Sequence, residues 1–191
     1  MSALLDHPRK HLITAEEYFR MGEAGVFAPE ARLELIEGEI IEMAPIGSPH
    51  AGCVNRLTRI FIQRAGGEAV VAVQNPVLIS NLSVPQPDFA LLAARADDYA
   101  AAHPQVADVY LVVEVADTTV KFDLGRKATI YARCGITELW VVDVNERAIH
   151  VFRQPGGDGY GEKFRVGAGQ SVACAALGAI EIEVAELFPA G

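Results

Sequence analysis

The sequence has no surplus of positive charge. Its 191 residues include 16 lysines and arginines against 25 aspartates and glutamates, so the net charge at pH 7 is −9. A basic surface is the usual first sign of a nucleic-acid-binding protein. Net charge governs solubility and long-range steering, however, and does not decide what one cleft binds. Composition therefore argues against a nucleic-acid partner at long range and says nothing about a local site.

Cysteines and long apolar runs are also scarce. Cys53, Cys134 and Cys174 are far apart and form no C-x-x-C pair, which indicates neither a disulfide framework nor a zinc site. No apolar run approaches the roughly 20 residues of a membrane span. The N-terminus lacks an apolar block behind a basic end, so no signal peptide is expected. These absences predict a cytoplasmic protein without a membrane partner.

The sequence does contain enough apolar residues for a well-packed core. A single domain is predicted over residues 1–191. Hydrophobic residues make up 51% of the chain and charged residues 21%, as in globular proteins. Helices are predicted at 15–22, from Ser48 (as N-cap) to Gly66, at 95–102 and at 123–133. Strands are predicted in a hairpin hinged at Glu37-Gly38, and at 68–73, 76–80, 87–92, 109–115, 137–144 and 148–153, followed by a flexible turn at 155–161. This order predicts an α/β or α+β fold, a mixed sheet with helices on its faces.

One carboxylate stands out within the predicted strand 109–115. Glu114 is the only charged residue there, and a buried lone charge needs a partner or a function. Asp88 begins a neighbouring strand, and Lys127 borders the apolar stripe of the following helix, from which it can face the sheet. Two carboxylates on adjacent strands can share Mg²⁺, and a nearby lysine can orient an attacking water. Together, these residue types are the ones that metal-dependent hydrolysis of a phosphodiester requires.

Each residue also has a simpler interpretation. Asp88 can be a turn residue beside proline, and Lys127 a surface lysine whose stem packs on apolar neighbours. His50 lies on the sheet side at the start of its helix, where a structural histidine is common. The acids of the predicted hairpin are expected to be solvated; they are Glu34, Glu37, Glu39 and Glu42. Several cations are either a soluble surface or the lining of one groove, namely Arg56, Arg59, Lys121 and Arg126.

An ordered series of short motifs resembles one known family. The motifs are Glu34-Leu35, Gly38-Glu39, Pro45, His50, Gln74-Asn75-Pro76, Pro87-Asp88, Val113-Glu114-Val115, Asp123, Lys127, Tyr131-Ala132, Gly135 and Glu138 to Asp143. In this order they resemble the Uma-two family of endonucleases, within the PD-(D/E)XK nuclease superfamily. The resemblance covers about 12–153, which leaves 154–191 as a β-rich C-terminal extension.

The resemblance implies a restriction-endonuclease-like core and a metal-dependent endonuclease acting on DNA. It implies Asp88 and Glu114 as ligands of Mg²⁺, with Mn²⁺ as a substitute, Lys127 as the active-site lysine, and His50 and Glu39 as supporting residues. The superfamily signature puts lysine two residues after the second acid, where this chain has Ala116. The resemblance therefore moves the lysine to Lys127, with Lys121 as a rival and Asp117 as a further acid or a turn residue.

Two other functions stay open at this point. A nuclease-fold protein can bind nucleic acid or a protein partner without cutting, and the net charge of −9 favours this alternative. The chain can also be an assembly protein whose apolar strands are buried in a homodimer. A homodimer is compatible with the nuclease interpretation as well.

Overall fold

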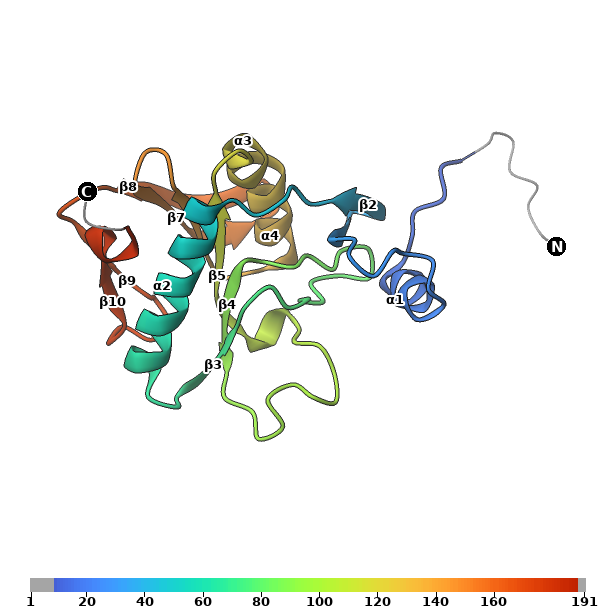
Figure 1. The fold of residues 1–191 in the computed structure, drawn as a ribbon, viewed down its shortest axis with the longest axis horizontal. Helices are drawn as coiled ribbons and strands as arrows, with labels where there is room; N and C mark the ends of the chain where they lie inside the picture. The colour runs from blue at the N-terminus through green and yellow to red at the C-terminus, as the bar shows by residue number, and fades with distance from the viewer. Residues whose placement is uncertain (1–8, 189–191) are drawn as a thin grey trace.

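A six-stranded mixed sheet holds the centre of the fold in the computed structural model, which describes residues 9–188 (Figure 1). Only β5 and β6 run parallel; all other neighbours are antiparallel. In spatial order the strands are β3 (Ala69–Ala72), β4 (Phe89–Ala93), β5 (Val109–Ala116), β6 (Glu138–Asp143), β7 (Ala148–Gly156) and β8 (Gly159–Val166).

Helices and two small hairpins surround this sheet. The helical segments are α1 (Ala15–Glu23), α2 (Ser48–Ala65), a 3-10 turn (Val106–Asp108), α3 (Val120–Phe122), a π-helical turn (Asp123–Lys127), α4 (Ala128–Cys134) and a closing 3-10 turn (Val184–Leu187). The hairpins are β1 (Leu33–Ile36) with β2 (Glu39–Glu42), and β9 (Ser171–Ala173) with β10 (Glu181–Glu183). Within residues 9–188, no helix is long and apolar enough to cross a membrane.

The two faces of the sheet are covered by different helices (Figure 1). On one face α2 packs against the sheet, with the Phe61 ring 4.7 Å from that of Phe89 and 6.0 Å from that of Trp140. On the other face α4 packs through residues such as Tyr131. Successive side chains of a strand point to opposite faces. Glu114 therefore points to the α4 face.

The N-terminal elements build a small layer beside the sheet. The α1 helix has the predicted capping box, in which the Glu17 amide donates to Thr14 Oγ1 at 3.2 Å and the Thr14 amide donates to Glu17 Oε2 at 2.8 Å. The hairpin β1–β2 turns at Glu37-Gly38 as predicted, with φ of 51° and 78°. A backbone pairing of Leu35 with Val84 ties this hairpin to the rest of the domain.

Three local predictions were wrong, each for a backbone reason. Residues 95–102 form turns because Asp98 and Tyr99 have positive φ, which a right-handed helix does not allow. Residues 76–80 make isolated bridges and fold back toward 83–85, so they form no strand. The turn predicted at 155–161 is much tighter, because β7 and β8 stay paired up to Gly156 and Gly159.

Candidate active site

The predicted carboxylates meet at one end of the central sheet. Phe89 of β4 pairs with Val113 of β5, so Asp88 and Glu114 come next in register, on the same face of adjacent strands. The Val115 amide donates to Asp88 Oδ2 at 2.9 Å, which fixes Asp88 against β5. Both side chains are buried, at 4% and 3% exposure. The adjacency expected from the sequence is therefore present.

Asp88 is held by side chains from two other segments. His50 Nε2 donates to Asp88 Oδ1 at 2.9 Å from the first turn of α2, which begins after Gly47 as N-cap. Gln74 Nε2 donates to the same oxygen at 3.2 Å. Burial alone would raise the pKa of Asp88, but the hydrogen bond and charge of His50 and the Val115 amide bring it below its usual value. Asp88 is therefore ionised at neutral pH.

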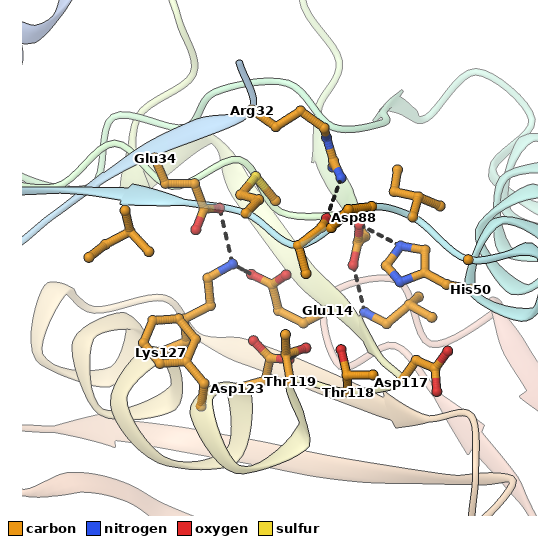
Figure 2. A pocket seen from close by; sticks show the side chains of 18 of the residues that line it. Arg32, Glu34, His50, Asp88, Glu114, Asp117, Thr118, Thr119, Asp123 and Lys127 are labelled. Carbon is orange, nitrogen blue, oxygen red and sulfur yellow. Dashed lines mark hydrogen bonds and ion pairs between the residues drawn. The ribbon is translucent and has the colours of Figure 1, made fainter. Parts of the chain in front are cut away.

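Lys127 turns inward and joins two carboxylates. Its Nζ lies 3.0 Å from Glu114 Oε1 and 3.0 Å from Glu34 Oε1, and the lysine is only 4% exposed (Figure 2). Burial would lower the pKa of Lys127, but the charges of Glu114 and Glu34 raise it, so the ammonium keeps its proton. The inward direction expected for this lysine is confirmed.

Glu34 is a site residue that the sequence interpretation missed. It is 1% exposed instead of solvated, and its Oε1 also accepts from the Gln86 amide at 2.8 Å. The side chain reaches the site because β1 is held in place by the backbone bridge between Leu35 and Val84. The motif Glu34-Leu35 was the only signal in the sequence that could have found it.

Tyr131 and Asp123 complete the buried polar network. The Tyr131 hydroxyl donates to Glu114 Oε1 at 2.6 Å, and burial raises the pKa of Tyr131, so the phenol keeps its proton. Asp123 is 4% exposed and accepts from Thr119 Oγ1 at 2.5 Å. Burial raises the pKa of Asp123, against the opposing charge of Lys127. Figure 2 shows the Asp123 carboxylate beside Glu114, on the side away from Glu34.

The buried network contains more carboxylates than positively charged groups. Burial raises the pKa of Glu114 to about 8, against the charge of Lys127, and the charges of Asp123, Asp88 and Glu34 add to this rise. Three buried carboxylates, those of Glu34, Glu114 and Asp123, share the buried ammonium of Lys127, and they cannot all ionise easily without another cation. The network therefore has the charge imbalance that a bound cation would correct.

The chemistry of the donor atoms suits a divalent cation. Both hydrogen bonds to Glu114 go to Oε1, which leaves Oε2 without either of them. The surrounding cleft has a volume of about 460 Å³ and is lined by six carboxylates against Arg32, Lys127 and His50. Its acidic side chains are Glu34, Glu42, Asp88, Glu114, Asp117 and Asp123. Carboxylate oxygens are the ligands that Mg²⁺ and Mn²⁺ prefer.

A second group of potential metal ligands lies outside this cleft. Asp143, Glu146 and His150, near the β6–β7 turn, have ligand atoms within 4.8 Å of one another. Asp143 Oδ1 already accepts from the amides of Asn145 and Glu146, both at 2.9 Å. Glu146 Oε2 lies 3.2 Å from the Arg165 guanidinium. Within residues 9–188, no three acids or histidines of the cleft around Glu114 lie this close together, so Asp88 and Glu114 are a candidate pair of ligands there.

Two residues considered from the sequence lie elsewhere. Glu39 does not line the cleft; it pairs with Lys10 and, at 2.8 Å, with Arg126. Lys121 is exposed and also absent from the cleft lining. Asp117 does line the cleft. Of the two lysines considered, only Lys127 reaches the carboxylates.

Comparisons with known proteins agree with the fold. The crystal structure of a putative nuclease belonging to DUF820, from Anabaena variabilis, matches with a TM-score of 0.75 and 15% sequence identity. The match covers 92% of this chain and 97% of that chain, and at this identity it shows a shared fold only. No curated protein sequence matches the chain. The predicted fold, a mixed sheet flanked by helices in a nuclease-like domain, is confirmed.

The family comparison covers most of the sequence. The model of the family described as "Uma2: Putative restriction endonuclease" matches residues 15–185. This range contains the Asp88, Glu114 and Lys127 cluster and all of the central sheet. The resemblance of the ordered motifs is thereby confirmed, and the chain belongs to the Uma2 family.

Proposed function

We propose that this protein is a nuclease that hydrolyses phosphodiester bonds of DNA with a divalent cation, Mg²⁺ or Mn²⁺, in the cleft around Glu114. One observation carries the proposal. Asp88 and Glu114 are neighbours on adjacent strands, and Lys127 Nζ lies 3.0 Å from Glu114. The nuclease family and fold support the same reaction class.

Asp88 and Glu114 would hold the cation, with Asp123 close by. His50 and Gln74 orient Asp88, while Tyr131 and Lys127 hold Glu114 through one oxygen and leave the other for a ligand. When bound, the cation would lower the pKa of a coordinated water and screen charge on the phosphate. Outer partners of this kind fix ligands in place before the cation arrives.

Lys127 supplies a fixed positive charge at the floor of the cleft. Its ammonium is fixed by Glu34 and Glu114, so it cannot swing away as an exposed lysine would. A preorganised charge stabilises the negative charge that develops on a phosphate during hydrolysis. We assign Lys127 this role, and we assign Glu34 the role of holding the lysine in position.

Nuclease activity with added Mg²⁺ or Mn²⁺, and none with excess EDTA, is the result expected for the purified protein. Nicking of a supercoiled plasmid and cleavage of labelled oligonucleotides measure it. Activity that survives EDTA would contradict the metal requirement. Binding without cleavage of any DNA or RNA would favour the alternative, a nuclease-fold protein that binds a partner without cutting. A homodimer and a cytoplasmic location stay predictions from the sequence.

Cation binding is expected to tighten as the pH rises from 6 to 8. The pKa of Glu114 is raised to about 8, so below that pH a proton competes with the cation for this carboxylate. Displacing one proton changes the apparent affinity by up to about tenfold per pH unit, and the dependence levels off above the pKa. Mn²⁺ titration calorimetry at several pH values measures it.

The same titration has a matched control. Glu114→Gln removes the group that titrates, so its weaker Mn²⁺ binding should vary much less between pH 6 and 8. A wild-type affinity that is constant from pH 6 to 9 would contradict the competition between proton and cation.

A further inference from the structure

The cleft around Glu114 lies between two chain segments. One is the strap, defined as residues 43–47, which joins β2 to α2; the other is the facing wall, residues 117–123 (Figure 2). The strap is tied to Arg32, whose carbonyl accepts from the Met43 amide at 2.8 Å and whose Nη1 donates to the Ala44 carbonyl at 3.1 Å. At its other end, a Cβ built on Gly47 would lie 3.6 Å from Asp117 Oδ2. The two segments therefore converge at that end of the cleft.

The position of the carboxylates limits what can reach them. Glu114 and Asp88 are 3% and 4% exposed, so a phosphodiester must pass between the strap and the facing wall to contact them. The cleft volume of about 460 Å³ lies near the lower end of the range for small-ligand pockets, roughly 300 to 1,000 Å³. A B-form duplex is stiff over about 150 base pairs, so it does not bend easily into a cleft of this size. One unpaired nucleotide is a better match in size.

The lining of the cleft suits an exposed base. Ile41, Met43 and Ile46 line it on the strap side, and Phe122 lines it on the facing wall. Bases of single strands stack favourably on aromatic rings with little dependence on sequence. Methionine adapts its shape to flat aromatic partners. In a duplex the same base faces are already stacked and out of reach.

The lining of the cleft offers few cations to a duplex. In the cleft itself, Arg32 and Lys127 are the lysines and arginines of the lining. Specific duplex binding commonly uses about 6 to 10 phosphate contacts. A single strand crossing the cleft needs fewer.

We propose that the substrate strand enters this cleft unpaired, so that the preferred substrate is single-stranded DNA or an unpaired flap rather than a continuous duplex. This inference rests on the proposed nuclease function and adds the class of substrate. The strap and the facing wall admit one strand, Phe122 and the strap side chains contact its base, and Glu114 and Asp88 receive its phosphate.

Three substrates that share one labelled strand test this inference: the strand alone, the strand in a blunt duplex, and the strand as the unpaired flap of a duplex. With Mn²⁺ or Mg²⁺, the single strand and the flap should be cut at least about tenfold faster than the duplex, because a duplex must first unpair. Cuts in the flap substrate should map to its unpaired part. Equal or faster cleavage of the blunt duplex would overturn the inference and leave the proposed function intact.

Variants of the cleft lining and a binding measurement test the inference in two further ways. Phe122→Ala and Ile46→Ala should raise KM for the single strand several-fold, whereas Ile62→Ala, an exposed apolar residue outside this cleft, should not. An unchanged KM in both wall variants would count against the inference.

If no substrate is cut, the proposed function fails. Fluorescence anisotropy with Ca²⁺ then decides: tighter binding of the single strand supports the inference, and equal or tighter binding of the duplex overturns it.

Discussion

Glu114→Gln is expected to remove nuclease activity by about a thousandfold or more while the protein stays folded. An amide offers a cation no negative charge, whereas its carbonyl oxygen can still accept the bonds from Tyr131 and Lys127. Burial already disfavours the ionised form of Glu114, as its raised pKa shows, so losing the charge should not unfold the domain. Asp88→Asn is expected to cause a loss of similar size.

Single-turnover nicking rates measure this loss, and thermal unfolding monitored by circular dichroism checks the fold. Asp158→Asn is the matched control, because Asp158 is exposed in the β7–β8 turn, away from the cleft lining. That variant should cut at the wild-type rate. Near wild-type cleavage by both Glu114→Gln and Asp88→Asn would mean that the reaction takes place elsewhere or comes from a contaminant.

Lys127→Met is expected to impair both activity and stability. Methionine keeps most of the apolar stem, but it leaves Glu34 and Glu114 buried without a counter-charge. Removing one partner of a buried ion pair typically destabilises a protein by about 3 to 5 kcal/mol. Nicking should slow by about a hundredfold or more, because the fixed positive charge of the cleft floor is gone. Urea unfolding and single-turnover nicking measure the two effects.

The loss of stability should grow as the pH rises through about 8. The charge of Lys127 lowers the pKa of Glu114, which burial raises to about 8, so in the variant the pKa of Glu114 should lie higher still. Above pH 8 the variant therefore keeps a proton on folded Glu114 that the wild type has lost, and its stability continues to fall as the pH rises. In the wild type, the pKa of Lys127 is raised above 10.5, so the contribution of the lysine is fully present at this pH. The gap between the two proteins should therefore widen with pH.

Two further variants test whether the loss of stability comes from the buried ion pairs of Lys127 or from the removal of any lysine. Lys121→Met changes an exposed lysine six residues away in sequence and should alter stability by no more than about 0.5 kcal/mol. Adding Glu34→Gln to Lys127→Met should recover part of the stability but not the activity. If Lys127→Met unfolds at the wild-type urea concentration at pH 8, the buried ion pairs do not hold the site together.

The sequence predicted the parts of the site that depend on short-range pattern. Glu114 stands alone in an apolar run, which predicts a buried strand, and Pro87-Asp88 marks the start of another. Lys127 borders the apolar stripe of its helix, so its inward direction followed from helical periodicity. The helix itself differs from expectation, because it starts at Val120 and passes through a π-helical turn at Asp123–Lys127. Such turns are frequent at functional sites.

The choice between Glu34 and Glu39 could not be made from the sequence. Both belong to the β1–β2 hairpin, and the register places them on the same face. Glu39 lies closer to the turn and pairs with Arg126, while Glu34 lies deeper and meets Lys127. Only the docked position of the hairpin decides which acid is buried.

By itself the sequence determined the two buried strands that carry Asp88 and Glu114, because apolar runs are local properties of the chain. The tertiary structure alone decided which distant groups surround those acids. Glu34 is 93 residues from Lys127 along the chain, and His50 is 38 residues from Asp88, yet both pairs are in contact. Such contacts depend on how the hairpin and α2 pack on the sheet, and no local pattern encodes that packing.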